Sequence, residues 1–407
     1  MTEENKNENV VNTEQIPQIS PEEQVAGLLK RLDNKDFSLY FFVLDTLGNP
    51  VAGVANIYEH VKVLNDLGYK AVIMHEKNDY KLRMDPSNQN DNGRMGIADW
   101  LGEEYANLPH ISIENQQLNV TVADFIIIPE IFANIMDQVK KFPCKKVVFS
   151  QSYDYLLELL PIGKKWNYDY GFHDVITTSN KQAEYISKLF QGISTHVVPV
   201  SISDDFKPST LPKIPLVTIV TRNNTDAKKI ANAFYLQYPM YKFITFKELR
   251  GMAKADFAKE IGKACLGVWI DDSSGFGTFP LEAMKAGTPV IGKIPNMVPE
   301  WMETEAKNED GTPVIDDNGN KVMVVKNNGV WTNTTTNIPE LIATYMKVWF
   351  EDSVPQNLLN DMSETYPKYS IENQRTAIET VYSNLVNKRK GELSSMIASK
   401  TNEEIKA

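Results

Sequence analysis

The stretch LGVWIDDSSGFGTFPLEAMKAGTPVIG, residues 266–292, contains a complete sequence of strand, loop, helix and strand. Residues 266–270 are uniformly apolar, which predicts a buried strand. A polar, glycine-rich loop follows, and Pro280 stands near the start of a helix, where proline is well tolerated. Gly287-Thr288-Pro289 ends this helix, and residues 289–294 predict the next strand. Two buried strands joined by a helix are typical of a parallel sheet covered on both faces.

The same alternation of apolar runs and helical patterns continues in both directions. The predicted strands of the second half are residues 216–221, 242–246, 266–270 and 289–294, and those of the first half are 37–45, 70–75, 123–128, 146–150, 174–178 and 196–200. Between the halves lies FKPSTLPKIP, which contains three prolines and is the best candidate for a linker. We therefore predict an α/β fold with two doubly wound, Rossmann-like domains that face each other across a cleft, at residues 37–211 and 212–370.

Two terminal segments flank the predicted domains, and one insertion interrupts the second domain. Residues 1–36 are an acidic tail followed by a short helix, which we expect to begin with a capping box at Ser20 and Glu23. Residues 305–331 are predicted to be a hairpin insertion with a tight turn at Asn318-Gly319. Residues 371–407 are predicted to contain a C-terminal helix that crosses back to brace both domains, followed by a tail.

Composition limits the function classes. The chain has 407 residues and a formal net charge of −11, which disfavours general nucleic-acid binding because that binding depends on clustered Lys and Arg. No apolar run approaches the roughly 20 residues of a transmembrane helix. The acidic N-terminus lacks a hydrophobic signal region, so we expect a cytoplasmic location. The two cysteines, Cys144 and Cys265, are far apart and fit reduced core residues.

Loops after the predicted strands are where a ligand should bind, because the carboxyl ends of parallel strands meet at one edge of a sheet. Gly53 lies in the first such loop and either allows close approach of a ligand or only forms a turn. Arg222 ends the strand at residues 216–221, and Lys228 falls in the first turn of the next helix. A cation there opposes the helix dipole unless an anion such as a diphosphate binds beside it; the alternative is a solvated lysine.

The loop of residues 271–278 leads into the helix that carries Glu282. Its glycines flank Phe276 and leave backbone N–H groups directed at the cleft. A carboxylate at Glu282 can accept hydrogen bonds from two vicinal ribose hydroxyls, or it can merely complement the helix dipole.

The segment GFGTFPLEAMKAGTPVIG, followed by PNMVPEW, resembles the donor-site signature of retaining GT-B glycosyltransferases of the group 1 family. That signature has two glutamates separated by seven residues around a Gly-Phe-Gly turn. The resemblance implies that Glu282 binds the donor ribose and that Gly275, Phe276, Gly277 and Thr278 line the sugar and phosphate site. It also implies that Arg222 and Lys228 bind the diphosphate. In this family the first domain binds the acceptor and the second the nucleotide sugar.

The chain departs from the family pattern at two places. Ser274 occupies the position of the first glutamate, so Asp272 or Asp271 would have to supply the carboxylate that contacts the sugar. Gln151 stands where the family often has a histidine, and His173 is the nearest histidine that could replace it on the acceptor side, although a structural role for His173 is the alternative.

We expect a glycosyltransferase that moves a sugar from a nucleotide-sugar donor to an unidentified acceptor, with retention of configuration. No Asp-x-Asp sequence is present, so we predict no metal and no cofactor beyond the donor substrate. Because Ser274 and Gln151 replace two family residues, a catalytically silent GT-B module that binds a nucleotide sugar or a glycan, or that scaffolds an assembly, is the alternative.

Overall fold

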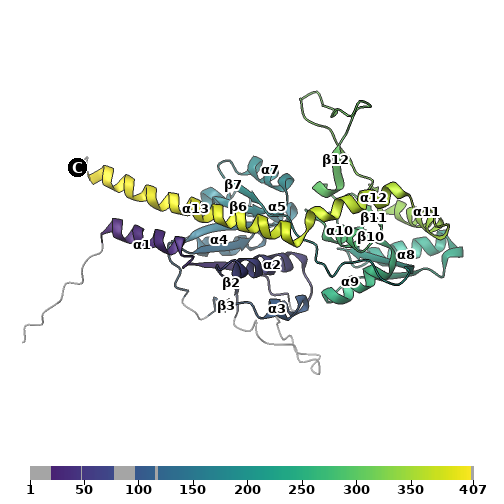
Figure 1. Cartoon of the computed structure of the whole chain (residues 1–407), viewed down its shortest axis with the longest axis horizontal. Coiled ribbons are helices and arrows are strands. Elements are labelled where there is room, and N and C mark those ends of the chain that lie inside the picture. Colours follow the sequence, from purple (N-terminus) through teal and green to yellow (C-terminus); the bar gives the residue numbers. More distant parts are fainter. Residues whose placement is uncertain (1–19, 47, 78–96, 115–117, 405–407) are drawn as a thin grey trace, which may run out of the picture.

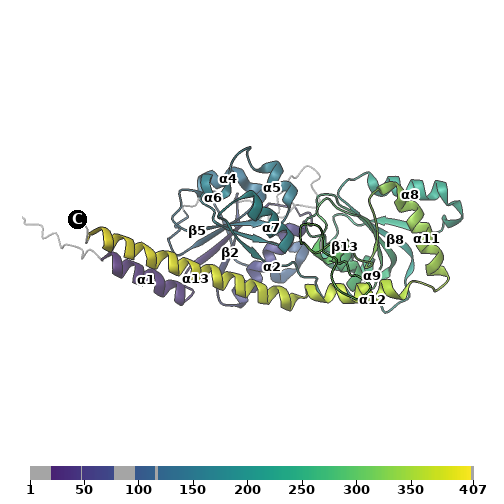
Figure 2. The ribbon, with the colours of Figure 1, turned by 90° about the horizontal axis from the view of Figure 1, so that it is seen from above.

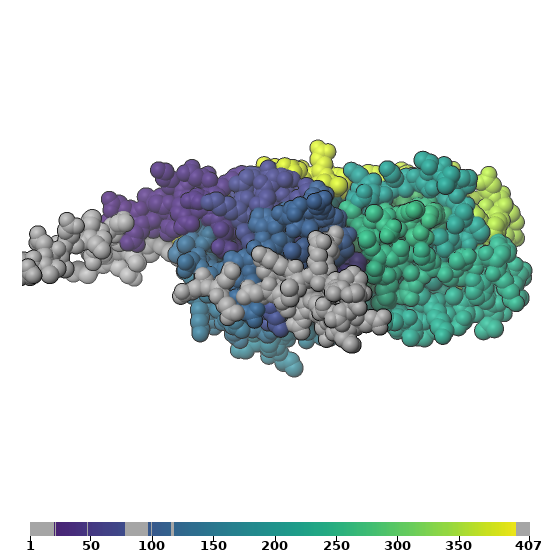
Figure 3. Space-filling view, turned by 90° about the horizontal axis from the view of Figure 1, so that it is seen from below, coloured from purple at the N-terminus to yellow at the C-terminus, as the bar shows by residue number. Residues whose placement is uncertain are grey.

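The computed structural model describes residues 20–46, 48–77, 97–114 and 118–404. The tail expected at residues 1–19 therefore lies outside the described residues. The described chain forms two α/β domains arranged end to end, with one long helix running along the first (Figures 1 and 2). Seen from below, the two domains are in contact along a seam between the blue and the green halves of the chain (Figure 3).

The first domain contains a seven-stranded sheet in which every paired neighbour is parallel. The strand order is β3-β2-β1-β4-β5-β6-β7. The strands are β1 (Ser38–Phe42), β2 (Lys70–His75), β3 (His110–Ser112), β4 (Phe125–Pro129), β5 (Lys145–Ser150), β6 (Asp174–Thr177) and β7 (Ser194–Val197). The order reverses between β1 and β4, so this domain is doubly wound, as predicted.

The second domain contains a five-stranded parallel sheet with the order β14-β11-β10-β8-β9. The strands are β8 (Ile214–Thr221), β9 (Thr245–Glu248), β10 (Ala264–Ile270), β11 (Val290–Lys293) and β14 (Val330–Thr332). Its order reverses between β10 and β8. The predicted fold class, two Rossmann-like domains, is confirmed.

Each sheet is covered by helices on both faces. In the first domain α2 (Ala52–Asp66) and α13 (Ile371–Glu404) pack on one face, and α4 (Ala133–Val139), α5 (Tyr153–Leu159), α6 (Trp166–Asp169) and α7 (Asn180–Leu189) pack on the other. In the second domain α9 (Lys254–Lys263), α10 (Thr278–Lys285) and α12 (Gln356–Thr365) lie opposite α8 (Asp226–Gln237) and α11 (Ile338–Phe350).

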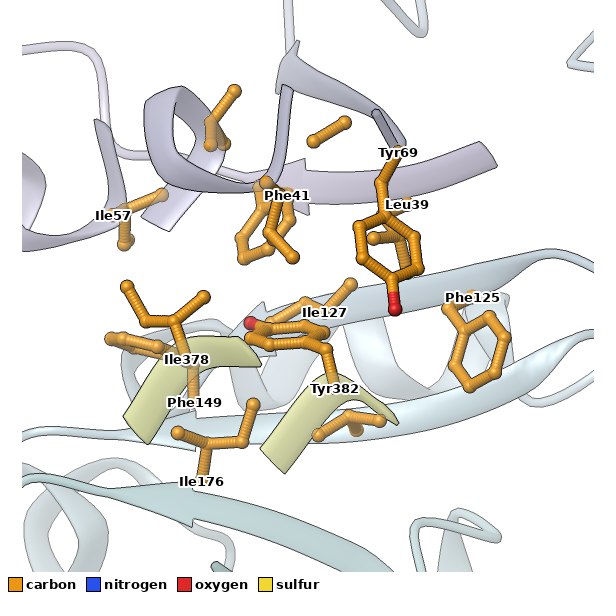
Figure 4. Close-up of a cluster of buried hydrophobic side chains, with 14 of the residues drawn as sticks. Leu39, Phe41, Ile57, Tyr69, Phe125, Ile127, Phe149, Ile176, Ile378 and Tyr382 are labelled. Atoms are coloured by element: carbon orange, nitrogen blue, oxygen red, sulfur yellow. The ribbon is translucent and has the colours of Figure 1, made fainter. Parts of the chain in front are cut away.

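The residues of β4 show how the strands form two cores at once. Phe125 and Ile127 belong to the cluster under α2 and α13, whereas Ile126 and Ile128 belong to the cluster under the opposite helices. Successive side chains of a strand point to opposite faces, so a continuously apolar strand fits only a sheet that is buried on both sides. Figure 4 shows the first cluster, where Tyr382 of α13 lies among side chains of the sheet.

The segment at residues 303–332 differs in part from the predicted insertion. β12 (Glu303–Glu305) and β13 (Met323–Val325) pair as an antiparallel ribbon that projects from the second domain (Figure 1). The expected turn is present, because Gly319 has a φ of +81° and Asp316 Oδ1 accepts the N–H groups of Asn318 and Asn320. Residues 330–332, however, form β14 of the parallel sheet rather than the end of a hairpin.

The N-terminal helix α1 (Pro21–Asp33) has the predicted capping box, in which Ser20 and Glu23 exchange hydrogen bonds between side chain and backbone. At the other end of the chain, α13 returns from the second domain to the first and passes α1 (Figure 2). Helix α13 is longer than the predicted helix at its C-terminal end.

A buried ionic cluster fastens α13 to the first sheet. The carboxylate of Asp174 is fully buried and lies 2.8 Å from Lys145 Nζ and 2.7 Å from Lys388 Nζ of α13. His196 Nε2 lies 3.0 Å from the same carboxylate. Burial alone would raise the pKa of Asp174, but these partners lower it below its usual range.

We predict that Asp174→Asn lowers the free energy of unfolding by about 3 kcal/mol, because it removes the buried carboxylate shared by Lys145 and Lys388 and leaves the buried Lys145 with Glu392 as its remaining acidic partner among the described residues. Urea unfolding followed by circular dichroism measures the change. Asp66→Asn is the matched control, since Asp66 forms partly exposed pairs with Lys62 and Arg375, and should have a much smaller effect. Equal losses in the two variants would contradict a dominant role for the buried cluster.

Candidate active site

A cavity of about 540 Å³ lies between the two domains, at the carboxyl ends of both sheets. It is lined by segments that follow β1, β4, β5 and β6 in the first domain and β8 and β10 in the second. The strand order reverses between β1 and β4 in one sheet and between β10 and β8 in the other. Such switch points are where open α/β sheets bind ligands.

The second domain's side of the cavity is built mainly from the loop at residues 271–278, which joins β10 to α10. The lining includes Arg222, Trp269, Asp271 and the run Ser273, Ser274, Gly275, Phe276, Gly277, Thr278 and Phe279. Trp301 Nε1 donates a 2.5 Å hydrogen bond to the carbonyl of Phe276, and the Phe276 ring packs edge-on against Tyr369. These contacts fix the loop from behind, so its backbone faces the cavity.

At Gly275 and Gly277 neighbouring atoms leave no room for a side chain. A Cβ at Gly275 would lie 3.2 Å from the carbonyl oxygen of Gln151, across the boundary between the domains. Gly277 has a φ of +71°, and a Cβ there would lie 2.7 Å from the ring of Trp269. A side chain at either position would push the loop out of place.

Gly277 is the N-cap of α10, and it faces the cavity together with Thr278 and Phe279. The first N–H groups of a helix have no partner within the helix, and the dipole makes this end positive. Pro280 removes one donor, so the N–H groups of the residues just before it are those available. The start of α10 can therefore bind an anion in the cavity.

Arg222 is held at the mouth of the same cavity by an ion pair. Its Nε and Nη2 donate to the two carboxylate oxygens of Asp271, at 2.9 and 3.2 Å, and its Nη1 donates to the hydroxyl of Tyr155 in the first domain. Burial disfavours the charge, but the hydrogen bonds and charge of Asp271 outweigh it and raise the pKa of Arg222. The guanidinium is thus fully charged and already positioned.

Glu282 lies one helical turn beyond Thr278 and faces a second, smaller cavity of about 120 Å³. Thr278 lines both cavities, so the two adjoin along α10. Burial raises the pKa of Glu282 to about 8, and the charge of Lys254, which lines the same cavity, lowers it only in part. The carboxyl is therefore mostly protonated at neutral pH in the absence of ligand.

On the first domain's side, Gly53 and Gln151 line the larger cavity. A Cβ at Gly53 would lie 3.1 Å from the Gln151 side-chain nitrogen, and this nitrogen donates to the Gly53 carbonyl at 3.0 Å. The Gln151 Oε1 accepts from Asn56 Nδ2 at 3.0 Å, and Asn56 Oδ1 accepts from Gln374 of α13. Gly53 lies in the first turn of α2 rather than in the loop before it, and the absence of a side chain there provides room for Gln151.

The remaining candidates do not line the larger cavity. Lys228 is exposed on α8, and His173 is exposed just before the amino end of β6, at the opposite edge of the sheet. Asp272 pairs with Lys293 Nζ at 2.7 Å, whereas its neighbour Asp271 is the acid at the cavity. Of the two acids that could replace the missing glutamate, each is already paired with a cation.

Glu130 is a cavity residue that the sequence did not reveal. It follows β4 directly, is only 3% exposed, and its Oε1 accepts the N–H groups of Gln151 and Ser152 at 2.9 and 2.7 Å. Burial raises the pKa of Glu130 to about 7 despite these hydrogen bonds. The signal that could have found it is an acid placed right after a wholly apolar strand, at the edge where ligands bind.

Within the described ranges, no group of three or more His, Cys, Asp or Glu side chains is arranged to hold a metal ion. Independence from metals remains a prediction, since substrate phosphates can contribute ligands of their own. In the same ranges no helix has the length and hydrophobicity needed to cross a bilayer.

No protein-family model matches the chain, and no curated protein sequence matches it. Solved structures do match over most of its length. Sucrose-phosphate synthase from Thermosynechococcus elongatus aligns with a TM-score of 0.55 at 11% identity, over 86% of this chain and 99% of that one. Anabaena HepE, in complex with UDP and glucose, aligns with a TM-score of 0.57 at 13% identity, over 86% and 100%. This is the GT-B fold.

A third GT-B structure, the pneumococcal O-GlcNAc transferase GtfA in complex with UDP and GlcNAc, aligns with a TM-score of 0.54 at 9% identity, over 87% of this chain and 99% of that one. At such identities the likeness concerns the fold alone. Arg222 and the start of α10 both line the cavity between the domains, so these groups belong to one site.

We predict that Glu282→Gln stabilises the protein progressively as the pH rises from about 4.5 to about 8, the range between the ordinary and the raised pKa of this carboxyl. In that range the unfolded state loses the proton that the folded state keeps, so the wild-type side chain increasingly disfavours folding. Thermal unfolding of both proteins across the pH range measures the difference in Tm. Glu184→Gln on the exposed side of α7 is the control; a constant difference for Glu282→Gln would contradict the prediction.

Proposed function

We propose that this chain is a glycosyltransferase that moves a sugar from a nucleoside-diphosphate sugar to an acceptor, with retention of configuration and without a metal ion. The observation that carries the proposal is the convergence of Arg222 and the start of α10 on one interdomain cavity, with Glu282 one turn further along α10. The two cavities give adjoining places for a diphosphate and a nucleoside. HepE and GtfA, which share the fold, were solved with UDP.

In the proposed complex the diphosphate accepts hydrogen bonds from the first N–H groups of α10 and from Arg222. Negative charge on the diphosphate grows as the bond to the sugar breaks, so fixed positive groups at this place stabilise the transition state more than the substrate. No metal is needed for that role if the guanidinium and the helix supply enough positive charge.

The ion pair between Arg222 and Asp271 has a place in this scheme. Without ligand the carboxylate of Asp271 occupies the guanidinium in a bidentate pair. The donor diphosphate, which carries more charge and the same bidentate geometry, would compete with Asp271 for the arginine. Asp271 would then be released next to Ser273 and Ser274, where a carboxylate is missing from the family pattern. We propose that it contacts the transferred sugar there, in preference to Asp272.

Glu282 is proposed to accept hydrogen bonds from the ribose hydroxyls. Because its pKa is raised to about 8 without ligand, binding of the hydroxyls would favour loss of the proton. Lys228, on the exposed side of α8, is proposed to reach the diphosphate only when the donor is bound; its long, flexible side chain allows this.

The second candidate, a silent module that binds a nucleotide sugar without transferring it, is favoured by one observation. Both acids next to Ser274 are paired with cations, Asp271 with Arg222 and Asp272 with Lys293. If neither is released on donor binding, no carboxylate from this loop reaches the sugar.

We predict that Glu282→Ala weakens nucleotide binding by roughly ten- to a hundredfold, the loss of hydrogen bonds to a charged group. Arg222→Ala should instead lower kcat for transfer or donor hydrolysis by roughly a hundredfold, more than it lowers affinity. Calorimetry with UDP, GDP and ADP and hydrolysis of the matching glucose conjugates measure the two effects.

Glu184→Ala, at an exposed position, and Arg375→Ala, at a partly exposed one, are the controls and should behave as wild type, because neither residue lines either cavity. Binding by the wild-type protein without any turnover would favour the silent module. If the wild-type protein binds none of the three nucleotides and none of their glucose conjugates, both candidates are contradicted.

We predict that turnover survives removal of divalent metals, since the sequence lacks Asp-x-Asp and positive groups of the protein face the cavity. Hydrolysis rates before and after dialysis against EDTA should agree within about twofold. Loss of most activity, restored by Mg²⁺ or Mn²⁺, would show that a metal bridges the phosphates.

A further inference from the structure

Two consecutive residues of the first domain touch the loop at residues 271–278 of the second. They are Gln151 and Ser152, which join β5 to α5, and we call them the β5–α5 junction. A Cβ at Gly275 would lie 3.2 Å from the carbonyl oxygen of Gln151, and Ser152 Oγ donates to the carbonyl of Ser273 at 3.3 Å. The junction thus lies directly against the loop that builds the donor side of the cavity.

The helix that follows the junction makes a third contact with the second domain. Tyr155, in the first turn of α5, accepts a hydrogen bond from Nη1 of Arg222, and the centre of its ring lies 5.4 Å from the guanidinium carbon. Ser152 is the N-cap residue of α5, so the junction places the start of this helix. The position of the junction therefore decides where Arg222 meets the first domain.

The side chain of Ser152 does not have the role that is usual at an N-cap. A serine at this position commonly accepts a backbone N–H group of its own helix. In α5 that capping bond is missing, and the hydroxyl donates across the domain boundary instead. The junction is therefore not held in place by a cap of its own helix.

Glu130 is the side chain that holds the junction. It follows β4 directly, is 3% exposed, and its Oε1 accepts the N–H groups of both Gln151 and Ser152, at 2.9 and 2.7 Å. Burial raises the pKa of Glu130 to about 7, so the protein keeps an acid in a place that disfavours its charge. An apolar side chain would suit such a place better if packing were all that it required.

We propose that Glu130 is a positioning residue for sugar transfer: it holds the β5–α5 junction and thereby sets how the first domain meets the loop at residues 271–278 and Arg222. This inference rests on the proposed glycosyltransferase function and adds a residue to it. Glu130 acts through the backbone of the junction and not on the reacting atoms. Alignment of this kind matters because a misplacement of about 1 Å can lower a reaction rate by about a hundredfold.

Asp124 is a matched control at the other end of β4. It is also 3% exposed, and its carboxylate accepts the backbone N–H groups of Ser38 and Thr121, each at 2.7 Å. Asp124 precedes β4 and Glu130 follows it, so the two acids make similar contacts at opposite ends of one strand. Unlike Glu130, Asp124 lines neither the larger nor the smaller cavity.

Donor hydrolysis and UDP binding by variants of the full chain test the proposal. Glu130→Ala removes the acceptor for the two N–H groups, and Glu130→Leu removes it while filling the buried space. We expect both to lower kcat by about tenfold or more and to change the Kd for UDP much less. Glu130→Gln keeps an acceptor oxygen and should restore kcat to within about threefold of wild type, since neutral hydrogen bonds are weaker than charged ones. Asp124→Ala should leave kcat and Kd close to wild type.

Hydrogen exchange followed by mass spectrometry gives a readout that needs no turnover. In Glu130→Ala and Glu130→Leu we expect faster exchange in residues 151–160 and also in residues 266–285, which belong to the other domain. In Glu130→Gln and Asp124→Ala both segments should exchange as in wild type. Thermal unfolding checks that every variant is folded, and Glu130→Leu keeps the test decisive if Glu130→Ala is not.

Four results would overturn the proposal. One is an unchanged kcat in Glu130→Leu. Another is an equal loss in Glu130→Gln, which would show that the charge or the proton of Glu130 is itself needed. Equal losses in Asp124→Ala would show general destabilisation, and faster exchange confined to residues 151–160 would limit Glu130 to the first domain. If the wild-type protein neither binds UDP nor hydrolyses a conjugate, the proposed function fails, whereas the exchange data still decide whether Glu130 aligns the domains.

Discussion

The site depends on the close approach of two backbone segments, the loop at Gly275 and the carbonyl of Gln151, which come from different domains. The absence of a side chain at Gly275 lets the carboxyl ends of both sheets close around one volume. From this contact follow the hydrogen bond between Ser152 and the Ser273 carbonyl and the contact of Arg222 with Tyr155. A site made from two domains in this way can exclude water from both sides of a bound molecule.

The two domains contribute different charged groups to the cavity. The second domain supplies the positive groups, an arginine and a helix start, whereas the first supplies a buried acid, Glu130, and an apolar wall. Glu130 and Glu282 both have pKa values raised by burial. At neutral pH these two carboxyls are therefore only partly ionised and oppose an incoming anion less than ordinary carboxylates would, in a protein whose formal charge is −11.

Much of this arrangement could be predicted because it is local in the sequence. The loop at residues 271–278, the helix after it and Arg222 at the end of a strand each depend on a few neighbouring residues, and the structure brings Arg222 and that loop together at the cavity. The short strands β3 and β14 escaped prediction because three residues give too little periodicity. Glu130, Asn56 and the pairing of Asp271 with Arg222 depend on contacts between distant segments, which no local pattern encodes. The same reason explains why Lys228 and His173 lie off the cavity although their sequence positions fit.

The chain passes between the domains twice, near residues 198–213 and 366–371, and the two passages are joined to each other. The N–H of Ile202 donates to the carbonyl of Tyr369 at 2.8 Å, and Ser201 donates to Gln374 at 2.6 Å. Helix α13 continues from the second passage as one stiff rod fastened to the first sheet through Lys388. The two passages thus lie side by side and are joined by hydrogen bonds, so any relative motion of the domains that keeps these bonds is restricted to rotation about this crossing.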